Sequence, residues 1–238
     1  MTFDEVIQQR RSIRDFTDQD ISDALMQTII SDALTAPSSS NTQGYRIAIA
    51  KGETKNALKA ALTEKFVKAS ALKRKPLPQK VVQGLLGGVL PDGDFKPDIN
   101  YPPELKKRAI ECGAGLYDTL GIARGDYSAR EQQMKRNFEF FDAPVELFLF
   151  VHGDRGVYSA LDGGMFLQTL MLSASAHGLG SCAQASVAMW GGTVRKYFDV
   201  GRDYKLICGL SLGYPTDAVV NTFRPNKRSA EELCLPER

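Results

Sequence analysis

Hydrophobic side chains recur along most of the chain at the three- and four-residue spacing that is typical of helices. Thr2 and Glu5 have the spacing of a capping box, so a short helix is expected directly after Thr2. A second helix is expected from Ser22 to Leu34, before Pro37. The same periodicity predicts further helices at about 52–72, 104–120, 128–140, 161–176 and 188–198.

Segments with a strand-like pattern are few. Tyr45–Ala50 and Lys205–Leu212 are expected to be strands, and Val145–Val151 is expected to be a buried strand, although it carries a glutamate. Leu161–Ala176 is apolar on almost every side, which predicts a helix in the centre of the fold. Because helices predominate and do not alternate regularly with strands, the pattern indicates an α+β fold.

The segment 73–103 departs from these patterns, with six prolines, four glycines and no strong periodicity. We expect it to be a surface insertion with one short helix near 79–86, within a single domain that spans 1–238. Proline reduces the entropy lost on ordering and glycine provides hinges, which suits a lid over a flat ligand, with Phe95 and Tyr101 as aromatic contacts. The alternative is an element that packs on a partner subunit.

Composition and charge narrow the function classes. Thirty Lys and Arg against 28 Asp and Glu give a net charge of +2, which argues against nucleic acid as the main partner. Apolar runs are far shorter than the roughly 20 residues of a membrane span, so we expect no membrane partner and a cytoplasmic location. The four cysteines are scattered without a Cys-x-x-Cys pair and there are only two histidines, so neither a disulfide framework nor a metal site is expected.

The densest candidate chemistry lies at the end of the first helix. Arg10, Arg11, Ser12 and Arg14 place three guanidiniums and a hydroxyl within five residues, and arginine binds phosphate through two parallel hydrogen bonds. The alternative is that these cations stabilise the C-terminus of the helix.

Two further polar segments could belong to the same site. Ser38, Ser39 and Asn41 lie in a loop of short hydrogen-bonding side chains, for which the alternative is a solvated turn. The segment 221–228 forms a second basic cluster near the C-terminus, for which the alternative is a solvated tail. Two basic clusters at opposite ends of a nearly neutral chain could clamp one anionic ligand.

The segment 178–183 formally matches the Gly-x-Gly-x-x-Ala fingerprint of dinucleotide-binding folds. That fingerprint needs a strand that leads into the glycines, whereas here an apolar helix precedes them. Gly178 is therefore interpreted as the glycine that ends this helix.

Six segments, in this order along the chain, resemble the FMN-dependent nitroreductase family. They are Arg10–Phe16, Ala36–Gln43, Asp142–Val145, Gly178–Cys182, Leu210–Pro215 and Asn221–Arg224. The insertion before Tyr101 and the run Asn137–Pro144 resemble the branch that includes nitrobenzoate reductases.

The resemblance implies a nitroreductase-like α+β fold, with a central, mostly antiparallel sheet flanked by helices, and a domain-entwined homodimer with two FMN sites at its interface. Each site would be built from both chains. The residues that it implies for FMN are Arg10, Arg11, Ser12 and Arg14 for the phosphate, ribityl chain and N1–O2 edge, Ser38, Ser39 and Asn41 from the partner chain, Gln184, Ala185 and Ser186 near N5, and Arg224 with Lys227 or Arg228 for the phosphate.

The activity implied by the resemblance is that of an NAD(P)H-dependent oxidoreductase with NADH or NADPH as donor and a nitroaromatic or quinone-type acceptor. Hydride transfer through flavin N5 would then follow ping-pong kinetics, and no side chain would have to act as acid or base. The alternatives are a flavoprotein of the same fold with other chemistry, such as reductive dehalogenation or flavin fragmentation, and a non-catalytic FMN-binding protein.

Overall fold

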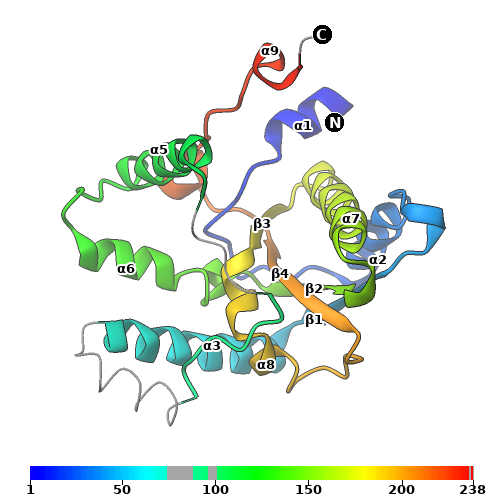
Figure 1. Ribbon diagram of the computed structural model, residues 1–238, viewed down its shortest axis with the longest axis horizontal. Helices are drawn as coiled ribbons and strands as arrows, with labels where there is room; N and C mark the ends of the chain where they lie inside the picture. Colours follow the sequence, from blue (N-terminus) through cyan, green and yellow to red (C-terminus); the bar gives the residue numbers. More distant parts are fainter. Residues whose placement is uncertain (74–87, 96–100, 236, 238) are drawn as a thin grey trace.

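The fold is built on an antiparallel sheet, as seen in the computed structural model, which describes residues 1–73, 88–95, 101–235 and 237. Its strands are β1 (Tyr45–Ala50), β2 (Val145–His152), β3 (Gly180–Gln184) and β4 (Tyr204–Gly213). Within the described residues the order is β1-β2-β4-β3, and every neighbouring pair is antiparallel (Figure 1). The predicted α+β class with a mostly antiparallel sheet is therefore confirmed.

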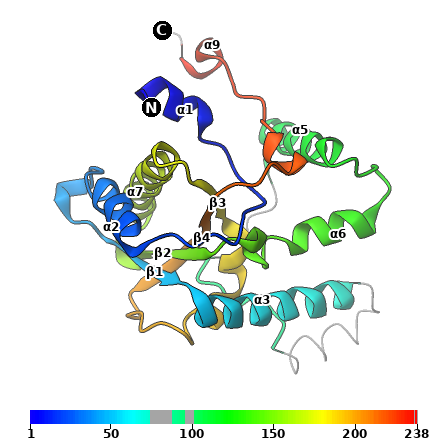
Figure 2. The same cartoon turned by 180° about the vertical axis from the view of Figure 1, so that it is seen from behind.

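Helices flank this sheet. Figure 1 shows α2 and α7 on one side of it, α3 and α8 on the other, and α1, α5 and α9 further out; Figure 2 shows the same arrangement from behind. Within the described residues the helices are α1 (Phe3–Gln9), α2 (Asp23–Ala33), α3 (Gly52–Lys73), α5 (Pro103–Thr119), α6 (Tyr127–Lys135), α7 (Val157–Ala176), α8 (Gly191–Val194) and α9 (Ala230–Leu233).

One face of the sheet packs against α2 and α7. Leu147 of β2, Ile29 of α2 and Leu170 of α7 are fully buried in one cluster. Helix α7 comes close to the sheet at Gly163, where a Cβ would lie 2.8 Å from Cγ1 of Val151. These contacts confirm the prediction of a helix at the centre of the fold.

The opposite face holds an aromatic cluster. Phe148 of β2 lies in it together with Leu58 of α3, and the rings of Phe138 and Trp190 are 5.0 Å apart. Aromatic rings bury large apolar areas, so this cluster fixes α3 against the sheet.

The predictions that depend on a few neighbouring residues are confirmed. The Thr2 hydroxyl accepts from the Glu5 amide and the Glu5 carboxylate accepts from the Thr2 amide, which is the predicted capping box. Ser22 caps α2, and β1 has the predicted bounds. Gly178, which follows α7, has a φ of 78° and ends that helix as expected.

The helix predicted over 128–140 ends early, because α6 stops at Lys135. Phe140, Phe141 and Asp142 have φ angles of 55°, 51° and 64°, which a right-handed helix cannot contain. Arg136 fixes this turn through ion pairs with Asp15 and Asp142.

The helix predicted over 188–198 is confirmed only in part, because helical structure ends at Val194 and most of it before Gly191 is not α-helix. The chain there forms the 3₁₀ helix η4 (Ala185–Trp190) and then the short helix α8. Two neighbouring glycines, Gly191 and Gly192, disfavour a longer helix. Residues of the 73–103 insertion also contact η4: the amides of Asp92 and Gly93 donate to the Met189 carbonyl at 3.0 and 3.1 Å.

Strand β3 is missing from the sequence prediction. Its residues, Gly-Ser-Cys-Ala-Gln, include no β-branched or aromatic side chain, so its pairing with β4 and not its composition makes it a strand. The short helix predicted near 79–86 lies outside the described residues. Among the helices that are described, none has the length and apolar character needed to cross a membrane.

Candidate functional site

The N-terminal arginine segment, residues 10–14, runs alongside the edge strand β3. Ser12 and Ser181 form a parallel bridge, and the Ile13 amide donates to the Ser181 carbonyl at 3.0 Å. The approach is close because β3 begins with glycine: a Cβ on Gly180 would lie 2.6 Å from Cγ1 of Ile13. Residues 10–14, which are far from β3 along the chain, therefore place side chains at the free edge of this strand.

Asn221 joins this segment to the C-terminal part of the chain. The Arg14 amide donates to Asn221 Oδ1 at 2.8 Å, and Arg11 Nε donates to the Asn221 carbonyl at 2.6 Å. Asn221 Nδ2 donates to the carbonyls of Asp15 and Thr216 at 2.8 and 3.0 Å. Asn221 is only 3% exposed, so one buried side chain holds together two segments about 200 residues apart.

The two predicted basic clusters consequently meet. Arg224 donates to the Gln8 carbonyl at 2.8 Å. Burial, and to a lesser degree repulsion by Arg224, lower the pKa of Arg11. Among the described residues, Arg10, Arg11, Arg14 and Arg224 form no ion pair with a carboxylate. Like charges held together without counter-charge favour the binding of an anion.

A cavity of about 140 Å³ lies at this cluster. Arg10 and Arg11 line it together with the start of β3, from Gly178 to Ser181. Its size and charge suit a phosphate group, since arginine pairs with phosphate through two parallel hydrogen bonds.

Lys227 lies in a different hollow. That cavity, of about 430 Å³, lies between α5 and the C-terminal segment, and Arg108, Arg224 and Lys227 contribute positive charge to it. Arg108 donates to the Asn226 carbonyl at 3.1 Å, which ties α5 to this segment. Arg224 thus lies between the two hollows.

Arg14 lies further along β3. Its Nη1 donates to the Ser12 carbonyl at 3.3 Å. Its charge acts on the neighbouring Cys182, although burial dominates and raises the pKa of that thiol to about 11. Cys182 is 4% exposed, so it is a neutral packing residue.

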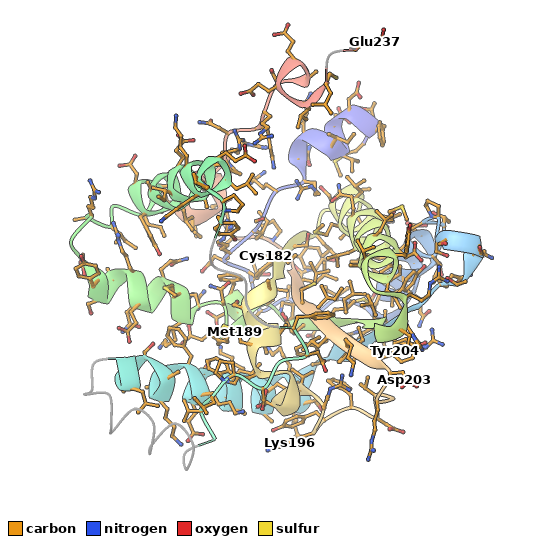
Figure 3. All side chains as sticks on the ribbon, viewed as in Figure 1. Cys182, Met189, Lys196, Asp203, Tyr204 and Glu237 are labelled. Atoms are coloured by element: carbon orange, nitrogen blue, oxygen red, sulfur yellow. The ribbon has the colours of Figure 1, made fainter. Side chains whose placement is uncertain are left out.

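The end of β3 presents small side chains. Ala183 and Ala185 are exposed, whereas Gln184 between them is 2% exposed. Figure 3 labels Cys182 on β3 and Met189 in η4, which precede and follow these residues along the chain. Methyl groups on an exposed strand end leave room for a flat ligand.

Gln184 points inward. Its Nε2 donates to the Asn137 carbonyl at 2.7 Å, and its Oε1 lies 2.9 Å from the Ser211 hydroxyl. The side-chain amide is thus fully used inside the protein, and only the backbone of Gln184 is left for a ligand. Ser186 is half-buried, with a hydroxyl that has no partner among the described residues.

The serine-rich loop lies elsewhere in the chain. The Ser39 amide donates to Oδ1 of Asp162 on α7 at 3.1 Å, and the Ser38 hydroxyl accepts from the Gln43 amide at 3.0 Å. Asn41 accepts from the Gln43 side chain and has a φ of 53°. No hydrogen bond or ion pair among the described residues joins this loop to residues 10–14 within one chain.

The arrangement defines a candidate anion-binding site on the edge strand of an antiparallel α+β fold. The Nitroreductase family matches residues 7–214. The 4-nitrobenzoate reductase of Pseudomonas putida is 33% identical over 234 residues, which cover 96% of this chain and 92% of that protein. The nitrobenzene nitroreductase of Ectopseudomonas oleovorans is 32% identical, with 98% of this chain and 94% of that protein covered.

A solved structure has the same fold over its whole length. The FMN and NADPH-dependent nitroreductase NfnB from Sphigopyxis sp. strain HMH has a TM-score of 0.85 and 32% identity, with 100% of both chains covered. The chain belongs to the nitroreductase family, and within it to the nitrobenzoate-reductase-like branch. The family and branch indicated by the six sequence segments are confirmed.

Asn221→Ala tests the connection between the two basic segments. The variant loses three side-chain hydrogen bonds, so we expect the free energy of unfolding to fall by about 1–3 kcal/mol and the amides of Ile13 and Arg14 to exchange faster. The control is Asn226→Ala, because only the backbone carbonyl of exposed Asn226 is bonded. Equal urea-unfolding curves and equal hydrogen exchange in the two variants would contradict this role of Asn221.

Proposed function

We propose that this chain is an FMN-dependent NAD(P)H oxidoreductase that reduces nitroaromatic or quinone-type acceptors. The observation that carries the proposal is the cluster of arginines, which have no carboxylate partner among the described residues, together with the exposed Ala183 and Ala185 at the end of β3. The names of similar proteins support it, since two NfnB structures are described as FMN-dependent and one of them is a complex with NADPH.

The residues present fit FMN. Arg10, Arg11 and Arg224 offer guanidiniums to a phosphate, Ser12 offers a hydroxyl, and Lys227 or Arg228 extends the positive charge. Ala185, Ser186 and the backbone of Gln184 would face the ring near N5.

When bound, FMN supplies the redox chemistry, accepting a hydride from the reduced nicotinamide and passing it to the acceptor. Arg14 would offer positive charge to the N1–O2 edge of a bound flavin, which would favour the reduced state. No side chain of this site has to move a proton. The donor product leaves before the acceptor enters, so we propose ping-pong kinetics.

We propose that the site is shared within a homodimer. Ser38, Ser39 and Asn41 would come from the partner chain, because within one chain no hydrogen bond or ion pair among the described residues joins this loop to the arginine segment. Exposed apolar side chains on three helices support a covered surface: Phe3 on α1 is 71% exposed, Ile110 on α5 is 61% exposed and Leu161 on α7 is 57% exposed.

The segment 73–103 belongs to the same proposal as part of a single 1–238 domain. Phe95 and Tyr101 at its described end are 53% and 51% exposed. We propose that it influences acceptor choice as a lid; packing on the partner subunit is the alternative.

The redox function is tested on the purified protein under argon. We expect about one FMN per chain, bleaching of the flavin by NADH or NADPH, and recovery of colour on addition of a nitroarene or quinone, with parallel double-reciprocal plots. Yellow protein that no nicotinamide bleaches would support a non-catalytic binding protein. Bleaching without recovery by either acceptor would favour other flavin chemistry.

Arg14→Ala tests the residue placed at the ring. We expect FMN affinity to fall about tenfold, because a charge-assisted hydrogen bond contributes about 1.5–3 kcal/mol. The midpoint potential of the bound flavin should become more negative by about 30 mV for each 1.4 kcal/mol lost from the reduced state. The exposed Arg202→Ala is the control for loss of one positive charge. An unchanged potential in FMN-loaded Arg14→Ala would place Arg14 away from the ring.

The shared site is tested by mixed dimers. One chain carries Arg14→Ala and the other carries Ser38→Ala, Ser39→Ala and Asn41→Ala, each on its own affinity tag. A shared site leaves one of the two sites in the mixed dimer intact, so about half of the wild-type turnover should return. Mixed dimers no more active than their parents, or a folded FMN-loaded monomer in sedimentation, would show that each site is built from one chain.

A further inference from the structure

Glu146 lies in the middle of the sheet with no exposure to solvent. It belongs to β2, and its Cα partner in the neighbouring strand β4 is Ser211. Space for its side chain exists because residue 209 is glycine: a Cβ there would collide with Glu146 Oε1. Among the described residues no lysine, arginine or histidine forms an ion pair with it. The carboxyl group is thus built into an interior that provides no counter-charge.

The hydrogen bonds around Glu146 have a defined direction. Gln184 Nε2 donates to the Asn137 carbonyl at 2.7 Å, so the opposite atom of that amide, Oε1, must be the one 2.9 Å from Ser211 Oγ. An amide oxygen only accepts, and the Ser211 hydroxyl therefore donates to it. Ser211 Oγ also lies 2.8 Å from Glu146 Oε2. Its single hydrogen is already used, so the proton in this contact comes from Glu146.

An ionised Glu146 would leave two oxygen atoms facing each other with no hydrogen between them. If Glu146 were a carboxylate, the Ser211 hydrogen would turn toward it, and Gln184 Oε1 would then meet only lone pairs at 2.9 Å. Glu146 Oε1 has no partner among the described residues, a situation far more unfavourable for a buried carboxylate than for a neutral acid.

The surroundings agree with a neutral acid. Burial raises the pKa of Glu146 well above its usual range, and the bond to Ser211 opposes this to a lesser degree. Glu146 in turn contributes to the raised pKa of the thiols of Cys182 on β3 and Cys208 on β4. Burial raises the pKa of these thiols to about 11 and about 12, so both are neutral at physiological pH. The charge of Arg14 acts in the opposite direction on the pKa of Cys182, while η4 contributes the apolar Val187.

We propose that Glu146 is a neutral carboxylic acid and a positioning residue for the flavin site. Its proton, through Ser211, fixes the direction of a hydrogen-bond chain that runs across β2, β4 and β3 to Asn137 and locks the Gln184 side chain. Gln184 leads directly into Ala185 and Ser186, which face the flavin if the proposed function holds. The chain therefore holds the ligand-facing end of β3 from inside the sheet.

The protonation state is tested by the pH dependence of unfolding. Unfolding exposes the acid, which releases its proton above the ordinary glutamate pKa, so folding stability should fall as pH rises from about 5 toward the folded-state pKa. One released proton raises the unfolding constant tenfold for each pH unit in that range. Glu146→Gln, which keeps a donor to Ser211, should lack this one-proton slope.

Glu237→Gln is the matched control, because Glu237 is exposed in the C-terminal segment and labelled in Figure 3. It should keep the wild-type slope. Parallel curves for wild type and Glu146→Gln between about pH 5 and 8 would overturn the proposal.

Infrared spectroscopy gives an independent measurement. The wild type at neutral pH should have the carbonyl stretch of a protonated carboxyl group, which shifts in D₂O and is absent from Glu146→Leu. Leucine suits the apolar surroundings of residue 146, so this variant provides the comparison if Glu146→Gln does not fold. Wild-type and Glu146→Leu spectra that are identical in this region would overturn the neutral acid.

The positioning role is tested by FMN titration. Glu146→Gln should keep wild-type affinity within about twofold, while Glu146→Leu and Ser211→Ala should weaken it about tenfold. Wild-type affinity in the leucine and alanine variants would overturn the positioning role. Wild-type protein that binds no FMN would overturn the proposed function and with it the role toward the flavin, whereas the unfolding and infrared results would still decide the state of Glu146.

Discussion

The hydrogen bonds of the Asn221 side chain hold together two parts of the chain that repel each other. They join the backbone at Arg14 and Asp15 to the segment that leads to Arg224, and they are buried, so water does not compete for them. Together with the bond from Arg224 to the Gln8 carbonyl, they keep the guanidiniums of Arg11 and Arg224 close enough to repel each other. Arginines held together without carboxylates favour the binding of an anionic ligand, which supplies the missing negative charge.

The positive charge of these arginines lies at the edge of β3. A free strand edge exposes backbone groups, and its alanines present little steric bulk. The arginine segment covers one part of that edge through the Ser12–Ser181 bridge and leaves the part near Ala185 open. From inside the sheet, Gln184 anchors the same strand through Ser211 and Asn137. The candidate site is therefore fixed from two sides, by Asn221 outside and by the Gln184 contacts inside.

The features that the sequence predicts best are those that depend on residues close together in the chain. The α1 capping box, the start of α2 at Ser22 and the Gly178 terminator depend on residues a few positions apart, and the structure confirms each of them. Both basic clusters could be recognised as candidates because arginine chemistry is visible in composition. Their meeting could not, because it depends on one asparagine whose partners lie about 200 residues away.

Other features depend on pairing that composition does not reveal. Strand β3 has a sequence suited to a loop and becomes a strand through β4. The region after it is a 3₁₀ helix partly because Asp92 and Gly93 bind to Met189. Gln184 could be assigned to the site by resemblance, but its inward direction depends on Asn137 and Ser211.

The central claim is that the arginine cluster holds a phosphate, and a comparison of FMN with riboflavin tests it most directly. Riboflavin has the same ring and ribityl chain without the phosphate. The account predicts that FMN binds at least about a hundredfold more tightly, equivalent to about 2.7 kcal/mol from charge-assisted hydrogen bonds, and that added salt reduces this difference. Equal affinities for the two flavins, at low and at high salt, would contradict it.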